Sequence, residues 1–148
     1  MSRPTLYSHF PTREDLIEAA MNRALADAQR DIAASRIDDG PPREALQRLV
    51  TAGWRTLARS LAIARAAHEL LPPDRIRRIH QAAFEPVRQL IARGQQAGAF
   101  RDDQPMEWMV TVLYALLHAA ADEVINGRLD SESAAALIHG TTLGAFRS

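Results

Sequence analysis

Apolar side chains recur every three or four positions along most of the chain, and no segment convincingly alternates apolar and polar residues. This spacing puts the apolar side chains on one face of a helix, so the sequence predicts an all-α protein. Proline, glycine and aspartate clusters divide the pattern into segments. We expect helices over about 13–34, from Pro41 or Pro42 past Leu57, from Ser60 to Leu70 or Leu71, from Pro73 to near Gly98, from Asp103 past Val124, and from Asp130 or Ser131 nearly to the end of the chain.

Individual residues mark the expected helix ends. Thr12, followed three positions later by Asp15, forms an approximate capping box. Ser60 and Asp103 are small polar residues placed to cap the helices that follow them. Gly98 is placed to end a helix, because glycine adopts the left-handed conformation that a helix terminus commonly uses.

The most regular apolar stripe in the chain, between Ile76 and Gly94, contains a proline. Pro86 has no backbone N–H, and its ring crowds the carbonyl group of Ala82. We therefore expect a long helix that is kinked near this position.

Composition narrows the function classes. The 148 residues include 18 basic and 18 acidic side chains, and every basic one is arginine. Without cysteine there is no disulfide, thiolate metal site or cysteine nucleophile, and without lysine there is no Schiff base or phosphate-loop lysine. The N-terminus has no leader pattern, and no apolar run approaches about 18 uninterrupted residues, so we expect a soluble cytoplasmic protein that does not enter a membrane.

Signatures of catalysis are missing from the sequence. His68 and Glu69 are not followed by the second histidine of a helical zinc motif. His118 and Asp122 lie one helical turn apart, but two ligands make an incomplete metal site, and we expect a structural hydrogen bond there instead. We find no glycine-rich phosphate loop or nucleophile elbow, so we expect no enzyme, no metal and no cofactor.

The first ten residues divide into an apolar and a polar set at helical spacing. Leu6 and Phe10 lie four positions apart and would face inward. The remaining side chains carry groups that reach phosphates or base edges in a DNA groove. Composition alone favours a plainer alternative, a capped surface turn before a long helix. The candidate DNA-binding residues are Arg3, Pro4, Thr5, Tyr7, Ser8, His9 and, at the start of the next helix, Arg13.

The stretch from Thr5 to Leu16, Thr-Leu-Tyr-Ser-His-Phe-Pro-Thr-Arg-Glu-Asp-Leu, resembles the recognition helix and following turn of the tetracycline-repressor (TetR/AcrR) family of bacterial regulators. The segment 98–105, Gly-Ala-Phe-Arg-Asp-Asp-Gln-Pro, is similar to the connection between two later helices of that family. With the helix order, the resemblance covers the whole chain. It implies a small helix-turn-helix DNA-binding domain, and a larger domain that binds a small-molecule effector and dimerises through its last two helices.

This sequence begins at the third helix of the family pattern, without the two helices that would support the recognition helix. We therefore expect residues 1–11 to be a remnant of the DNA-binding domain and 12–148 to form the effector-binding and dimerisation domain. We expect residues 1 to about 10 to be mobile or packed differently, and this chain alone not to bind DNA specifically. A complete protein of this family would bind operator DNA.

Candidate effector-binding residues come from the middle helices. A mainly aliphatic and aromatic set would suit an apolar or aromatic molecule. Five members also have a plainer role: Trp54 and Trp108 as core residues, Arg65 as the partner of Glu69 on a helix surface, and His68 and His80 as hydrogen-bonded core histidines. The candidates are Trp54, Leu57, Arg65, His68, His80, Phe84, Trp108, Met109 and Tyr114.

The two final helices carry small and aliphatic residues over faces wider than one neighbour would cover. Such faces suggest a homodimer, against the alternative of a monomer whose earlier helices cover them. The candidate interface residues are Leu113, Leu116, Leu117, Ala120, Val124, Leu137, Ile138, Thr141 and Ala145. Two functions follow: part of a ligand-responsive regulator, most simply a repressor, or a helical dimer without DNA binding that binds a small molecule or captures a full-length partner.

Overall fold

The computed structural model describes residues 9–147, and every regular element in this range is a helix. The helices are α2 (Arg13–Ala34), α3 (Pro42–Arg59), α4 (Leu61–Leu70), α5 (Pro73–His80), the 3₁₀ helix η1 (Gln81–Phe84), α6 (Glu85–Gln96), α7 (Met106–Ile125) and α8 (Ser131–Phe146). The all-α prediction is confirmed, and so are most of the predicted helix limits.

Local signals set several helix ends as expected. The Thr12 hydroxyl accepts a hydrogen bond from the backbone N–H of Asp15 at 3.1 Å, and caps α2. The Asp130 carboxylate accepts one from the N–H of Ser133 at 3.0 Å, and caps α8. Gly98 follows α6 with φ of +66°, a conformation in which a side chain would be strained.

Of the two other predicted caps, Ser60 does occupy the N-cap position of α4, whereas Asp103 was wrong. Ser60 precedes α4, but its side chain makes no capping hydrogen bond. Asp103 instead forms a bidentate ion pair with Arg101, at 2.6 and 2.7 Å, which occupies both carboxylate oxygens. Pro105 takes the N-cap position of α7, and its fixed φ turns the chain into the helix.

A single kinked helix was predicted around Pro86; the structure instead has three successive elements, α5, η1 and α6. The chain leaves α-helical geometry after His80, forms a single 3₁₀ stretch, and resumes as α6 with Pro86 in the first turn. A proline is tolerated there because the first N–H groups of a helix have no intrahelical acceptor. His80 ends α5 and Phe84 ends the 3₁₀ stretch, so both side chains lie at this break.

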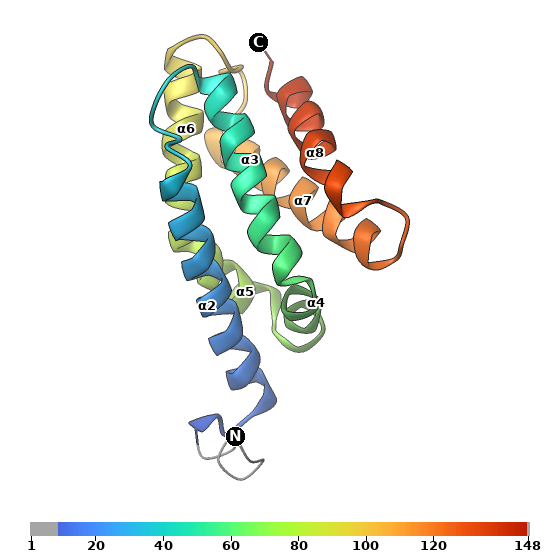
Figure 1. Ribbon diagram of the computed structural model, residues 1–148. Coiled ribbons are helices and arrows are strands. Elements are labelled where there is room, and N and C mark those ends of the chain that lie inside the picture. Colours follow the sequence, from blue (N-terminus) through green and yellow to red (C-terminus); the bar gives the residue numbers. More distant parts are fainter. Residues whose placement is uncertain (1–8, 148) are drawn as a thin grey trace.

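Helix α3 lies at the centre of the fold (Figure 1), with α2 and α6 along one side and α8 along the other. Its buried face includes Leu46, Val50 and Trp54. These pack in one core with Ile91 of α6 and Phe146 of α8. A smaller apolar cluster joins the N-terminal half of α2 to α4 and α5.

Within residues 9–147, α7 is the one helix whose length and composition would allow it to cross a membrane, and only 22% of that apolar segment is buried in the chain. It packs against α6 and α8. The criterion does not indicate a membrane location, because core helices of soluble proteins also meet it. It does identify α7 as a helix with apolar surface left uncovered.

Candidate functional site

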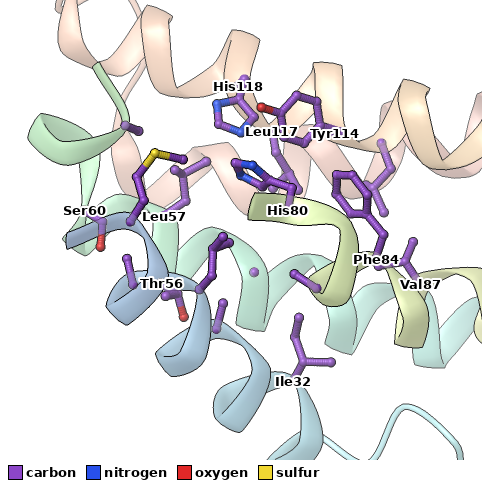
Figure 2. A pocket seen from close by; sticks show the side chains of 18 of the residues that line it. Ile32, Thr56, Leu57, Ser60, His80, Phe84, Val87, Tyr114, Leu117 and His118 are labelled. Carbon is purple, nitrogen blue, oxygen red and sulfur yellow. The ribbon is translucent and has the colours of Figure 1, made fainter. Parts of the chain in front are cut away.

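A cavity of about 140 Å³ lies between α2, α3, α4, η1 and α7 (Figure 2). Its wall is almost entirely apolar, and no arginine, aspartate or glutamate lines it. The lining residues are Met21, Ala24, Leu25, Ala28, Ile32, Leu49, Val50, Gly53, Thr56, Leu57, Ser60, Ile63, Ala64, His68, His80, Ala83, Phe84, Val87, Leu113, Tyr114, Leu117 and His118. An apolar concave space with a few polar groups is the usual form of a small-molecule site.

The space exists because small residues face one another where α2 and α3 meet. Ala24 and Ala28 of α2 and Gly53 of α3 all line the cavity. A Cβ atom added at Gly53 would have no atom within 4 Å, so the glycine leaves volume unfilled. Larger side chains at these positions would extend into the cavity.

The break before Pro86 builds another part of the wall. His80 ends α5, and Ala83 and Phe84 belong to η1. All three line the cavity, and His80 and Phe84 stack with ring centroids 5.8 Å apart. The sequence feature that predicted a kink therefore positions side chains of the site.

Four aromatic and imidazole rings meet at the α7 side of the cavity. The Tyr114 ring lies 4.2 Å from His118, 5.1 Å from His80 and 5.5 Å from Phe84, measured between ring centroids. The His80 and Phe84 contacts are edge-on, with interplanar angles of 80° and 82°. Figure 2 shows the Tyr114 hydroxyl group and the His80 and His118 rings gathered at this end.

The tautomer of His80 follows from its hydrogen bond. Its Nδ1 atom lies 2.8 Å from the carbonyl oxygen of Ile76, and a carbonyl can only accept, so Nδ1 carries the proton. Burial lowers the pKa of His80, which keeps the ring neutral at pH 7. Neutral imidazole with a protonated Nδ1 has a free lone pair on Nε2. His80 therefore presents a hydrogen-bond acceptor.

Burial also governs the two neighbours on α7. It lowers the pKa of His118 to about 3, with a smaller contribution from the adjacent imidazoles of His80 and His68. It raises the pKa of Tyr114. The rings of His80, Tyr114 and His118 are thus electrically neutral at physiological pH, although all three are ionisable. Residues 9–147 contain no cluster of three or more His, Asp or Glu side chains arranged to bind a metal.

A second, more polar cavity of about 530 Å³ adjoins the first. The two share His68, His80, Phe84 and Tyr114 in their linings. Charged residues line the second cavity, including Arg88, whose Nε atom donates to Glu107 at 2.7 Å. The charges of this pair neutralise each other. The apolar cavity therefore has a polar chamber beside its ring cluster.

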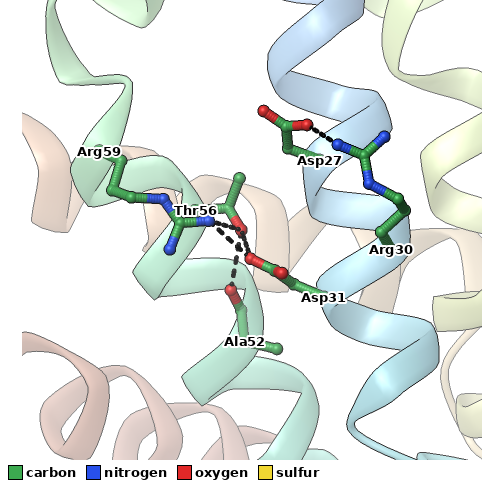
Figure 3. A network of polar contacts seen from close by, with 6 residues as sticks. All are labelled: Asp27, Arg30, Asp31, Ala52, Thr56 and Arg59. Carbon is green, nitrogen blue, oxygen red and sulfur yellow. Dashed lines mark hydrogen bonds and ion pairs between the residues drawn. The ribbon is translucent and has the colours of Figure 1, made fainter.

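A polar clamp holds α2 against α3 beside the cavity (Figure 3). The Thr56 hydroxyl and the Arg59 guanidinium each donate to Asp31 Oδ2 at 2.7 Å. These two bonds, the one from Thr56 above all, lower the pKa of the Asp31 carboxyl. Thr56 also lines the cavity, but its hydroxyl proton already takes part in the hydrogen bond to Asp31.

Five of the predicted effector-binding residues line the cavity: Leu57, His68, His80, Phe84 and Tyr114. The other four, Trp54, Arg65, Trp108 and Met109, line neither chamber.

Trp54 is a core residue, as its plainer interpretation predicted, and its Nε1 donates to the carbonyl oxygen of Ser131 at 2.9 Å. Met109 is fully buried in the same core. Arg65 forms the predicted exposed pair with Glu69, at 3.0 Å. The prediction of Trp108 as a core residue was wrong: it is 55% exposed on α7, where the described helices leave its side uncovered.

The sequence-based selection missed the α2 side of the cavity and His118. The apolar stripe Met21, Leu25 and Ala28 was recognisable, but nothing in it distinguished a cavity wall from a solid core. His118 follows Tyr114 by one turn, and that spacing was the available signal. Leu113 and Leu117, expected at a subunit interface, also line the cavity.

The candidate interface residues differ in burial. Leu113, Ala120 and Ile138 are buried in the core of the chain itself, so they offer no surface to a partner. Leu116 and Val124 are half-buried and pack against that core. Leu137, Thr141 and Ala145 are exposed, with Leu137 at 53%.

The candidate DNA-binding residues Arg3, Pro4, Thr5, Tyr7 and Ser8 lie outside the described residues, as does almost all of the segment expected to be mobile or repacked. His9 and Arg13 are within the described range, and both are exposed. Arg13 is the first residue of α2, the helix whose C-terminal half forms the cavity wall.

Several solved structures with the same arrangement of helices are transcriptional regulators. The chain superposes on the TetR-like regulator LfrR from Mycobacterium smegmatis, solved in complex with proflavine, with a TM-score of 0.73 and 19% identity over 100% of this chain and 80% of that one. The chain has the TetR-like fold. No family model matches its sequence, and no curated protein matches it.

Two further regulators share this TetR-like fold. PfmR from Thermus thermophilus is 21% identical and superposes with a TM-score of 0.74, over 97% of this chain and 81% of that one. A TetR/AcrR-family regulator from Thermobifida fusca is 25% identical, with a TM-score of 0.65, over 100% and 82%. The resemblance noted in the sequence is therefore matched by the fold across the whole described chain.

Proposed function

We propose that this chain is the effector-binding and dimerising part of a TetR-family transcriptional regulator, whose DNA binding a small molecule relieves. In this proposal residues 1–11 belong to the DNA-binding domain and 12–148 form the regulatory domain. The observation that carries it is the apolar cavity of about 140 Å³ lined by helices of a TetR-like fold. The proflavine complex of LfrR gives one case of a small molecule bound by a regulator of this fold.

The position of α2 supports coupling between the cavity and DNA. This helix begins at Arg13, directly after the proposed DNA-binding segment, and its residues Met21 to Ile32 line the cavity. Arg75 of α5 forms ion pairs with Asp15 and Glu18 of α2. A ligand that separates the cavity walls would change the position of α2 relative to its neighbours. If the ligand binds this shifted arrangement more tightly than the arrangement that binds DNA, the affinity for DNA falls by the ratio of these two ligand affinities.

We further propose that the complete protein is a homodimer formed by α7 and α8. The support is an exposed surface of small and aliphatic residues on both helices. On α8, added Cβ atoms at Gly140 and Gly144 would meet nothing within 4 Å, so the backbone is open to a close-packed neighbour. Leu137 lies on the same helix, and Trp108 on α7. A two-fold dimer would bind a pseudo-palindromic operator.

The test begins with the native protein from its source cells. Its intact mass is compared with 16.4 kDa, and its binding to genomic DNA fragments is selected and quantified by fluorescence anisotropy at fixed salt. We expect sequence-specific binding, weakened when a small molecule that raises the melting temperature is added. A protein that binds no duplex specifically, with or without ligand, overturns the regulatory proposal.

A further inference from the structure

Two histidines of the cavity have ring nitrogens whose donor and acceptor roles are set by hydrogen bonds to the backbone. His80 and His68 each use Nδ1 to donate to a backbone carbonyl one turn earlier, those of Ile76 and Ala64, at 2.8 and 2.9 Å. When neutral, as burial keeps His80, such a ring offers Nε2 only as an acceptor. A ligand that meets His80 Nε2 must therefore bring a donor.

Donors are available beside this acceptor. The Tyr114 hydroxyl can donate or accept, and neutral His118 has one N–H and one lone pair. In residues 9–147, neither the Tyr114 hydroxyl nor the ring nitrogens of His118 have a hydrogen-bond partner, so the expected hydrogen bond between His118 and Asp122 was wrong. The rings of Tyr114 and His118 lie 5.1 and 6.0 Å from that of His80. A hydroxyl group placed among the three rings could donate to His80 and accept from one of its neighbours.

The remaining wall defines the rest of the ligand. No charged side chain lines the apolar cavity, so an ionised group would be desolvated there without a counter-ion, which is strongly unfavourable. The volume of about 140 Å³ is close to that of an engineered apolar cavity, about 150 Å³, that admits benzene. The space therefore suits one uncharged ring.

Resting on the proposed effector-binding function, we propose that the effector is an uncharged single-ring aromatic alcohol of the phenol type. Its ring fills the apolar cavity, and its hydroxyl group donates to His80 Nε2 and accepts from the Tyr114 hydroxyl or the His118 N–H. His80 is then the residue that distinguishes a phenol from a hydrocarbon of the same size. This goes beyond general affinity for apolar molecules, because it specifies a donor and excludes charge.

The experiment measures Kd for four ligands on the full chain at pH 7.5 by isothermal titration calorimetry. Phenol is compared with toluene, which replaces the hydroxyl by a methyl group, and with benzylammonium and benzoate, which carry charge. We expect phenol to bind about tenfold more tightly than toluene, the size of one buried hydrogen bond, and the charged pair to bind more weakly than both.

Variants assign the preference to His80. His80→Phe removes the acceptor and retains a flat ring, and we expect it to abolish the preference for phenol over toluene while toluene still binds. The same substitution at His139 of α8, which lines neither cavity, serves as the control and should leave the preference unchanged. Thermal unfolding checks that each variant is folded, and the ligand comparison on the unmodified chain stands without them.

The outcomes are distinct. Toluene binding as tightly as phenol, a preference for a charged ligand, or a preference that survives in His80→Phe overturns the phenol inference and leaves the effector-binding proposal intact. If none of the four ligands binds, the inference is overturned, and binding of a larger apolar panel then decides whether the effector-binding proposal stands.

Discussion

The ring of Phe100 lies against the backbone of Gly94, in the space that a side chain at Gly94 would need. A Cβ atom added there would lie 2.0 Å from Phe100 Cδ2. Phe100 is buried and packs edge-on against Phe146, with ring centroids 5.8 Å apart. This contact fixes the turn after α6 to the end of α8, where the Arg101 N–H also donates to the Phe146 carbonyl oxygen.

Gly94→Ala should therefore destabilise the fold, although alanine favours helices more than glycine does. The Phe100 ring cannot move without disturbing Phe146, so we expect a loss of about 1–3 kcal/mol, as for other overpacked cores. Urea unfolding followed by circular dichroism measures it. An unchanged or higher midpoint would contradict the packing described here.

Gly53→Ala is the matched substitution with the opposite expectation. It also lies within a helix, but the new Cβ atom enters the cavity and meets no atom within 4 Å. We expect a gain of about 0.5–1 kcal/mol in the free energy of unfolding from helix propensity. The same methyl group reduces the cavity, so ligand affinity measured by calorimetry should fall. Unchanged affinity would place the ligand elsewhere.

The neutral histidines make stability depend on pH. Their pKa values are lower in the folded chain than in the unfolded one, so protonation favours unfolding. The stability of the fold should fall as pH decreases below about 6.5, and for His118 the loss continues toward about 3, at about 1.4 kcal/mol per pH unit for one proton. Urea unfolding between pH 8 and 5 measures the slope. In His118→Phe, unfolding should take up about one proton fewer, so the slope should be smaller. Identical slopes in the two proteins would refute this account.

The clamp between α2 and α3 also makes the fold less stable as pH decreases, but in a lower pH range. The pKa of Asp31 is lowered, so its contribution to stability is complete above the ordinary carboxyl pKa and is lost as pH falls through the folded value. Thr56→Val removes the largest cause of that shift. We expect the variant to be less stable than the unmodified chain at pH 7, and the difference to shrink at low pH, as measured by thermal unfolding.

Thr111→Val is the control for that experiment. The Thr111 hydroxyl donates to the Glu107 carbonyl of its own helix at 2.9 Å and touches no carboxylate. Any stability change from this substitution should be the same at both pH values. A pH-independent difference in Thr56→Val as well would show that the hydroxyl does not act through Asp31.

Leu137→Glu tests the proposed dimer. A carboxylate at this position, 53% exposed in the single chain, would be desolvated in an α7–α8 interface. We expect dissociation to be favoured by about 2 kcal/mol or more, some thirtyfold in Kd. Analytical ultracentrifugation should then report 16.4 kDa instead of twice that mass. Gln47→Glu, which adds the same charge on the exposed face of α3, should remain dimeric.

The sequence determined the helices, because their limits depend on residues close together in the chain. Thr12, Pro86, Gly98 and Asp130 act within one or two turns, and the structure places each helix end or break as those residues predict. Asp103 does not cap α7 because its carboxylate binds Arg101, two residues away, instead of the backbone N–H groups of the helix.

Only the tertiary structure decided which apolar faces became core, cavity or surface. Trp54 and Trp108 both lie on helices with apolar faces, yet one is buried against α8 and the other is exposed, because α3 has neighbours on both sides and α7 does not. The meeting of His80 with Tyr114 and His118 likewise depends on the turn between α5 and α6 and on the packing of α7 across it. The spacing of apolar residues specifies which face of a helix is apolar. How deeply a residue on that face is buried, and whether a cavity lies beside it, depend on the side chains of the neighbouring helices.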